Sequence, residues 1–142
     1  MLQGSKLMKE IIIHTDGAAR GNPGPAGAGA ILKSSDGVVL ATVSEYLNEM
    51  TNNQAEYHAL ILALNEAIIA GAEAVKIYMD SELIVKQIKG EYRVKNEGLK
   101  PLYDKVVQSL KKFNTYTIEH VRREKNKEAD KLANLAIDDK KL

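Results

Sequence analysis

With 142 residues, the chain is long enough to bury one hydrophobic core, and we expect a single domain. The absence of cysteine excludes disulfides and thiolate-bound zinc and favours a cytoplasmic protein. The 20 basic and 19 acidic residues nearly cancel, so the overall charge does not indicate nucleic-acid binding. No apolar run approaches the roughly 18 residues of a membrane span.

The first part of the chain predicts three consecutive antiparallel strands. Its opening segment is rich in β-branched residues, and the glycines and prolines between Arg20 and Gly27 predict a loop after it. Ser35-Asp36-Gly37 has the turn chemistry of a hairpin. The three strands are expected over residues 10–16, 28–33 and 38–46.

A capping box predicts the start of the first helix. Thr51 takes the N-cap place, Gln54 follows three residues later, and the helical pattern continues to about Ala70. Glu56 falls on the same face as the apolar residues of this helix. A carboxylate on a buried face is unusual and needs a partner.

The second part of the chain alternates strands and helices. A strand, two helices, a strand and a final helix are expected over residues 75–80, 81–89, 99–113, 115–121 and 125–137. The order β-β-β-α-β-α-α-β-α predicts an α/β fold in which helices pack on a five-stranded mixed sheet. We expect this domain over residues 10–137 and a polar tail over 138–142. Residues 1–9 are expected to be an N-terminal extension, of which 1–7 would be vector-derived if Met8 is the native start.

Four carboxylates lie where predicted elements begin or end. Asp16 and Asp80 end strands, Glu56 lies near the start of a helix, and Asp130 lies in the first turns of the last helix. Taken singly, a turn explains Asp16, an N-cap explains Asp80 and the helix dipole explains Asp130. In open α/β sheets, however, sites form at the carboxyl ends of strands. Since clustered acids repel one another unless divalent cations neutralise them, four meeting acids would predict a metal site.

Four motifs in order carry a family resemblance. They are Thr15-Asp16-Gly17 with Gly21-Asn22-Pro23-Gly24-Pro25-Ala26-Gly27, then Thr51-Asn52-Asn53-Gln54-Ala55-Glu56, then Asp80-Ser81, then Asn126-Lys127-Glu128-Ala129-Asp130-Lys131-Leu132-Ala133-Asn134. The shorter motifs are common singly, but their order and spacing over about residues 10–136 closely resemble type 1 ribonuclease H. The short connection over residues 87–96 resembles the compact archaeal and bacterial form, without the basic protrusion or hybrid-binding domain.

The resemblance implies an endonuclease that cleaves the RNA strand of RNA/DNA hybrids and leaves 5′-phosphate and 3′-hydroxyl ends. It also implies two Mg²⁺ ions, with Mn²⁺ as a substitute, held by the four acids. Asp16 would bridge the ions, and Asp130 would complete the site of the water-activating ion. Glu56 and Asp80 would hold the ion at the leaving oxygen. A monomer without membrane or protein partner is expected, and double-stranded RNA stays open as a secondary substrate.

Residues beside these acids match family positions that contact the hybrid. Their amides both donate and accept hydrogen bonds, which suits minor-groove base edges and 2′-hydroxyls. A turn role for the first and helix capping for the others are the structural alternatives, and for Thr51 both roles can hold. The candidate substrate-binding residues are Asn22, Thr51, Asn52, Asn53 and Gln54.

Several positions depart from the better-known bacterial pattern. The loop before the last acid lacks the histidine thought to help product release, and Glu124 is its nearest titratable replacement. Glu82 replaces a glutamine, and Glu49 replaces an arginine that grips phosphate. A basic cluster either follows a phosphate backbone or forms a solvated surface. It comprises Lys86, Lys89, Arg93 and Lys95.

Two other functions compete with the nuclease. One is a non-catalytic hybrid-binding module, although binding alone would gain little from four mutually repelling acids. The other is a nuclease of the same superfold that acts on double-stranded RNA or DNA. His14 and His58 lie near two of the acids, but we expect neutral structural histidines, because the family's site uses oxygen ligands.

Overall fold

The β-branched segment at the start of the chain forms the central strand of the sheet. In the computed structural model, which describes residues 9–141, β1 (Glu10–Ala19) pairs antiparallel with β2 (Gly24–Ser34) and parallel with β4 (Ala74–Met79). The edges are β3 (Val39–Met50) and β5 (Thr115–His120), in the order β3-β2-β1-β4-β5. The predicted five-stranded mixed sheet is therefore confirmed.

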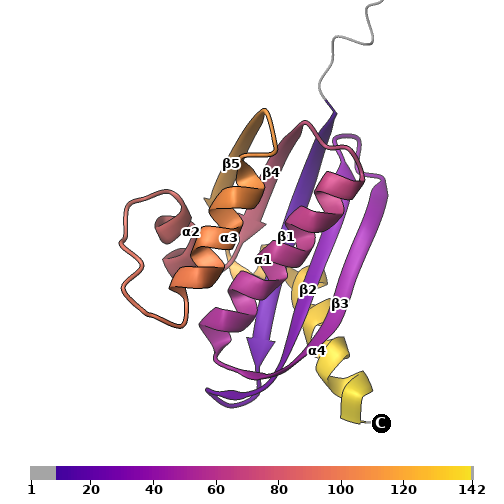
Figure 1. Cartoon of the computed structure of the whole chain (residues 1–142). Helices are drawn as coiled ribbons and strands as arrows, with labels where there is room; N and C mark the ends of the chain where they lie inside the picture. The colour runs from indigo at the N-terminus through magenta and orange to yellow at the C-terminus, as the bar shows by residue number, and fades with distance from the viewer. Residues whose placement is uncertain (1–8, 142) are drawn as a thin grey trace, which may run out of the picture.

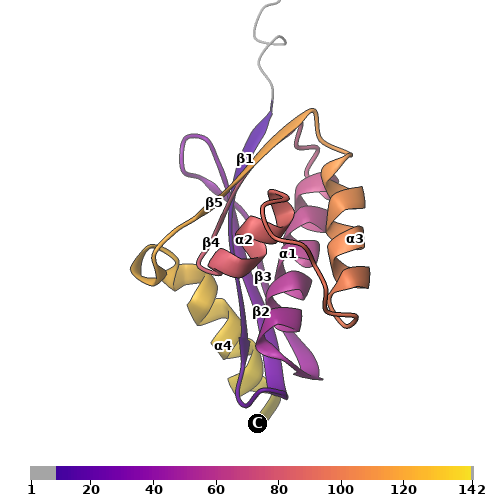
Figure 2. The same cartoon turned by 90° about the vertical axis from the view of Figure 1, so that its left-hand side faces the viewer.

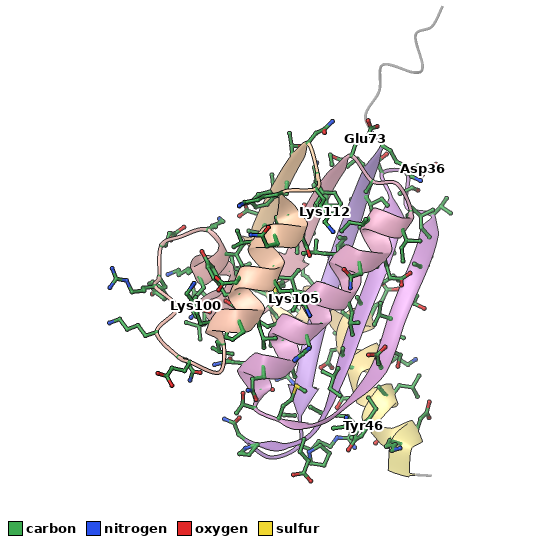
Figure 3. All side chains as sticks on the ribbon, viewed as in Figure 1. Asp36, Tyr46, Glu73, Lys100, Lys105 and Lys112 are labelled. Carbon is green, nitrogen blue, oxygen red and sulfur yellow. The ribbon has the colours of Figure 1, made fainter. Side chains whose placement is uncertain are left out.

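Helices cover both faces of this sheet. One face carries α1 (Asn52–Ile69) and α3 (Lys100–Leu110), and the other carries α4 (Lys127–Lys141) (Figures 1 and 2). The short α2 (Glu82–Ile88) follows β4 and contacts β5. Lys100 and Lys105 lie on the exposed side of α3 (Figure 3). The predicted α/β order is confirmed, with one added 3₁₀ turn at Arg123–Lys125.

The predicted capping box at the start of α1 is confirmed. Thr51 Oγ1 accepts from the Gln54 N–H at 3.2 Å, and Gln54 Oε1 accepts from the Thr51 N–H at 2.9 Å. Two otherwise unsatisfied N–H groups are thereby paired, which favours helix formation at this point. The inward face of the helix then enters the main core with Leu60, Ala63 and Ala67, all fully buried.

The first hairpin is longer than the sequence predicts. The predicted end of the first strand at Asp16 is wrong, because β1 continues to Ala19, and β2 already begins at Gly24. Glycine normally interrupts a strand, but here the antiparallel pairing continues through Gly17↔Ala28 to Ala19↔Ala26. The predicted loop therefore shrinks to a tight turn, closed by a 2.8 Å hydrogen bond from Arg20 N–H to Pro25 O.

The last helix begins and ends later than predicted. It covers Lys127–Lys141, so residues expected in a polar tail are helical, and Arg20 reaches from β1 to pair with Asp138 on its last turns. The helix lies very close to β2, since a Cβ added at Gly29 would be 2.1 Å from Ala129 O. Of the predicted N-terminal extension, residues 1–8 lie outside the described residues. Along the described part of the chain, no helix is long and apolar enough to cross a membrane.

One buried hydrogen bond joins α1 to α2. The Tyr57 hydroxyl donates to Gln87 Oε1 at 2.7 Å, and both side chains are buried. We expect Tyr57→Phe to lower the free energy of unfolding by about 1–3 kcal/mol, because the glutamine oxygen would lose its partner without access to water. Urea denaturation measures the loss. Tyr116→Phe, at a 43% exposed tyrosine on β5, is the control and should be nearly neutral; equal losses would contradict the prediction.

Candidate active site

Two of the four acids meet where parallel strands end. The parallel ladder between β1 and β4 ends at the pair Thr15↔Met79, and Asp16 and Asp80 are the next residues on the two strands. β1 continues beyond Asp16, but its parallel pairing with β4 ends just before this residue. Asp16 therefore lies at the carboxyl end of the parallel part of the sheet. The N-cap alternative for Asp80 is wrong, because Ser81 caps α2 and accepts from the Ile84 N–H at 3.3 Å.

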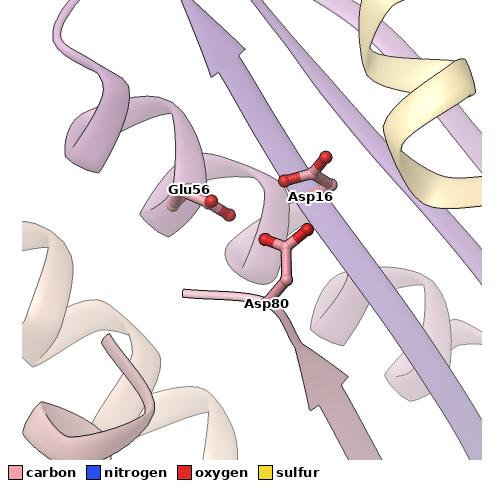
Figure 4. Close-up of side chains that lie close together, drawn as sticks. All are labelled: Asp16, Glu56 and Asp80. Carbon is pink, nitrogen blue, oxygen red and sulfur yellow. The ribbon is translucent and has the colours of Figure 1, made fainter. Parts of the chain in front are cut away.

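The N-terminal part of α1 brings Glu56 to these two acids. Glu56 is 4% exposed, and its Oε1 accepts from the Gly17 N–H at 3.0 Å. This close approach requires glycine, since a Cβ on Gly17 would lie 2.3 Å from the Ala55 carbonyl carbon. The three carboxylates point toward one another, with one oxygen from each within 4.8 Å of the others (Figure 4). The helical pattern predicted that Glu56 faces inward, and at this inward position Glu56 joins a cluster with Asp16 and Asp80.

Asp130 adds a fourth carboxylate from the opposite face of the sheet. It lies on α4, is half-buried, and lines a cleft of about 500 Å³ together with the other three acids. It is close enough to Asp16 to interact with its carboxyl group. The cleft is completed by Gly17, Ala18, Ala19, Arg20, Asn52, Ser81, Arg123 and Asn134. The structure thus brings all four predicted acids to one cleft.

Burial and mutual repulsion make these acids hard to ionise. Burial raises the pKa of Asp16, and the neighbouring charges of Glu56 and Asp80 raise it further. Burial also raises the pKa of Glu56, as does Asp80, whereas the hydrogen bond from Gly17 opposes the change. Burial raises the pKa of Asp80, against the lowering effects of the Asn126 amide and the Arg123 charge. A bound cation would reverse this by stabilising the charged forms.

The donor set fits a hard divalent cation. Asp16, Glu56 and Asp80 each offer a carboxylate oxygen, and oxygen ligands are those that Mg²⁺ and Mn²⁺ prefer. Neither histidine near the acids belongs to this group. Burial lowers the pKa of His14 and of His58, and the His14 ring stacks on Tyr78 with centroids 5.1 Å apart. Both observations agree with the expectation of neutral, structural histidines.

Removing one acid should stabilise the protein when no metal is present. Above about pH 4 the unfolded chain releases the Asp16 proton, while the folded chain retains it because its folded-state pKa is raised. The free energy of unfolding is therefore highest below that pH, and it falls as the pH rises toward the folded-state pKa of Asp16. We expect Asp16→Asn in EDTA to be about 1–3 kcal/mol more stable than the parent at pH 8 and equal to it near pH 4.

Urea denaturation in EDTA across this pH range measures the difference. The exposed Asp139 on α4 provides the control, and Asp139→Asn should follow the parent at every pH. A parent protein as stable as Asp16→Asn at pH 8 would contradict the repulsion argument.

The predicted substrate-binding residues surround the start of α1. Asn22 Oδ1 accepts from the Asn52 N–H at 3.0 Å, and Asn52 Oδ1 accepts from the Ala19 N–H at 3.3 Å. These bonds join the β1–β2 turn to the helix. Thr51 and Gln54 form the capping box, so their capping role is confirmed, while their contact with a hybrid stays a prediction. Asn52 also lines the acid cleft, and Asn53 beside it is half-buried.

The loop before α4 contributes residues to which the sequence assigned no role. Arg123 lines the cleft and its charge acts on Asp80, whereas Glu124 lies in a separate small cavity with His14. Asn126 is 1% exposed, and its Nδ2 donates to Thr15 O at 2.8 Å. A polar residue before an apolar helix could have signalled Asn126. No local pattern separates Arg123 from Glu124, since the two are adjacent in a short 3₁₀ turn whose orientation depends on the elements around it.

The basic cluster is divided between ion-paired residues and residues at an open cavity. Lys86 lies 3.9 Å from Glu82, and Lys89 lies 3.4 Å from Glu119. Arg93 and Lys95 instead line a separate open cavity beside Tyr92. Glu49 is exposed at the end of β3. Contact of this cluster with a phosphate backbone stays a prediction, and Arg93 and Lys95 at the open cavity are its candidates.

The sheet order and the acids from both of its faces define a ribonuclease H-like protein with a candidate metal centre. A family model described as reverse transcriptase-like matches residues 14–136. The crystal structure of LC11-RNase H1, isolated from compost by a metagenomic approach, in complex with an RNA/DNA hybrid is similar at a TM-score of 0.89. The two chains are 44% identical, and the match covers 93% of this chain and 99% of the LC11-RNase H1 chain. The chain belongs to the type 1 ribonuclease H family, in its compact form.

Two curated relatives are longer than this chain. Ribonuclease HI of Halobacterium salinarum is 42% identical over 126 residues, which are 89% of this chain and 63% of the relative. Bifunctional protein Rv2228c of Mycobacterium tuberculosis is 41% identical over 130 residues, or 91% of this chain and 36% of the relative. The chain therefore spans about a third of one relative and under two thirds of the other.

Proposed function

We propose that the chain is a metal-dependent endoribonuclease that hydrolyses the RNA strand of RNA/DNA hybrids. The observation that carries this proposal is the convergence of Asp16, Glu56 and Asp80 within 4.8 Å, in a cleft that Asp130 also lines. Buried acids that repel one another lower stability, so a role that requires their charge is the simplest reason to retain them. The family and the hybrid bound to LC11-RNase H1 support the same substrate.

The arrangement of the acids suggests a division of labour. Two Mg²⁺ ions, with Mn²⁺ as a substitute, would supply an activated water and stabilise the leaving 3′-oxygen of an in-line displacement. Glu56 and Asp80, which cluster with Asp16, would hold the ion at the leaving group. Asp130, reaching Asp16 from α4, would complete the other ion's site, and Asp16 would serve both. The products would carry 5′-phosphate and 3′-hydroxyl ends.

The substrate would lie across the start of α1. Asn52 lines the cleft, and Asn22 is bonded to its N–H. Together with Asn53, these residues would offer amides to minor-groove base edges and 2′-hydroxyls. Thr51 and Gln54 would act mainly by holding this turn in place. Arg123 offers a permanent positive charge beside Asp80, and we assign to it the contact of this loop with the phosphate. Glu124, the predicted product-release group, lines a separate cavity, and its role stays a prediction.

End-labelled substrates test the proposal. We expect a hybrid to be cut in its RNA strand with Mg²⁺ or Mn²⁺ and to stay intact in EDTA. Labelling either end of the RNA, and treating the products with phosphatase, identifies the 5′-phosphate. Parallel reactions with double-stranded RNA and double-stranded DNA test the rival nuclease. Binding of the hybrid without cleavage under any divalent cation would instead identify a hybrid-binding module and overturn the proposal.

A further inference from the structure

Asp130 has a hydrogen-bond donor one helical turn away on α4. Asn134 Nδ2 donates to Asp130 Oδ1 at 3.3 Å and to Asp130 O at 3.0 Å. Both residues line the acid cleft. The spacing of four residues places the amide directly over the carboxylate. One donor therefore holds both the side chain and the backbone carbonyl of Asp130, which limits rotation of its carboxylate.

The guanidinium of Arg20 determines the orientation of the Asn134 amide. Arg20, directly after β1, donates through Nη2 to Asn134 Oδ1 at 3.2 Å and to Asn134 O at 3.4 Å. A guanidinium has donors and no acceptor. The amide oxygen must therefore face Arg20, and the amide nitrogen must face Asp130.

Arg20 is itself held at two points. Its N–H donates to Pro25 O at 2.8 Å and closes the β1–β2 turn. Its Nη1 pairs with Asp138 Oδ1 at 2.5 Å, one turn beyond Asn134. The guanidinium thus reaches α4 from a fixed turn and lies in a fixed position on the helix. The planar guanidinium can hold two neighbouring residues of α4 at once, which the single ammonium group of a lysine does less well.

We propose that Arg20 and Asn134 form a positioning relay that aims the Asp130 carboxylate into the metal-binding cleft. The relay deepens the proposed function and rests on it for its role in cleavage. Asp130 needs such support more than the other acids, because it is half-buried and lies outside the group within 4.8 Å. Groups that hydrogen-bond to a metal ligand orient it, and their loss commonly weakens metal binding or activity about 10–100-fold.

Asn134→Asp tests the donor without changing the shape. The aspartate can still accept from Arg20 but cannot donate to Asp130. We expect Mn²⁺ affinity of the free protein, measured by calorimetry, to fall about 10–100-fold. The kcat for hybrid cleavage should fall with it, while KM for the hybrid stays close to that of the parent. Leu135→Ala, at the neighbouring exposed position, is the control and should leave both unchanged. Parent-like Mn²⁺ affinity in Asn134→Asp would overturn the relay.

Asn134→Ala separates the missing donor from the added charge of the aspartate. It should weaken Mn²⁺ binding as well, because it also lacks the amide donor. If Asn134→Ala bound Mn²⁺ like the parent, the loss in Asn134→Asp would come from repulsion between the new carboxylate and that of Asp130. That result would overturn the relay.

Arg20→Gln tests the second step and carries the proposal if the Asn134 variants do not fold. If Arg20 acts through Asn134, Arg20→Gln should weaken Mn²⁺ binding severalfold alone and add nothing in the Asn134→Ala background. Additive losses would overturn the relay, as would a lower Tm with unchanged metal affinity. A parent protein that binds Mn²⁺ but leaves the hybrid intact would refute the proposed function, and the metal-binding measurements would still test the relay.

Discussion

Asp80→Asn should abolish metal-dependent cleavage of the RNA strand while leaving hybrid binding measurable. Asp80 contributes an oxygen to the cluster with Asp16 and Glu56, and asparagine has the same shape without the charge. Loss of one preorganised charged group in a catalytic site commonly costs about 10²–10³-fold in kcat. We expect a loss of at least this size, because the group removed is also a predicted metal ligand.

The experiment separates chemistry from folding and binding. Single-turnover cleavage of an end-labelled hybrid measures the rate, and fluorescence anisotropy in Ca²⁺ or EDTA measures binding. Asp104→Asn, at an exposed acid on α3, is the matched control and should cleave at the parent rate. Thermal unfolding should show no loss of stability in Asp80→Asn, since one repelling charge has been removed. A fully active Asp80→Asn would refute the assignment of this acid.

Gly17→Ala should impair both folding and cleavage, although it adds only one methyl group. The added Cβ would lie 2.3 Å from the Ala55 carbonyl carbon and 2.4 Å from the Glu56 nitrogen. These are backbone atoms of α1 and cannot rotate away, so the helix must move from β1. Overpacking of this kind costs about 1–3 kcal/mol of stability. The same movement displaces Glu56 from Asp16, and a misplacement of about 1 Å can cost about 10²-fold in rate.

Gly98→Ala is the matched control for this substitution. Its new Cβ would meet the side-chain ends of Asn96 and Gln54 at 3.1 and 3.3 Å, and side chains can adjust. We expect Gly98→Ala to keep nearly parental stability and rate, measured by urea denaturation and by hybrid cleavage. If Gly17→Ala behaved like this control, the close approach of α1 to β1 would not be needed to place Glu56.

Local patterns predicted much of the fold, because the start and the buried face of a helix depend on residues that are close in the sequence. The capping box places the start of α1, and the 3.6-residue period places Glu56 on the buried face of that helix. Glycines misled the prediction of the first hairpin. At Gly17 the missing side chain does not end the strand but makes room for α1. A sequence pattern cannot distinguish these two uses of glycine, because the difference lies in the element packed against it.

The sequence by itself determined the order of the elements, the inward face of Glu56 and, through four motifs, the family. Only the tertiary structure decided that Arg123 lines the cleft while Glu124 does not, and that Arg20 holds Asn134 beside Asp130. Arg20 and Asn134 are 114 positions apart, so their contact arises only when β1 and α4 pack together. Periodicity reports which side of an element is buried, whereas the aim of a side chain into a cleft depends on distant elements.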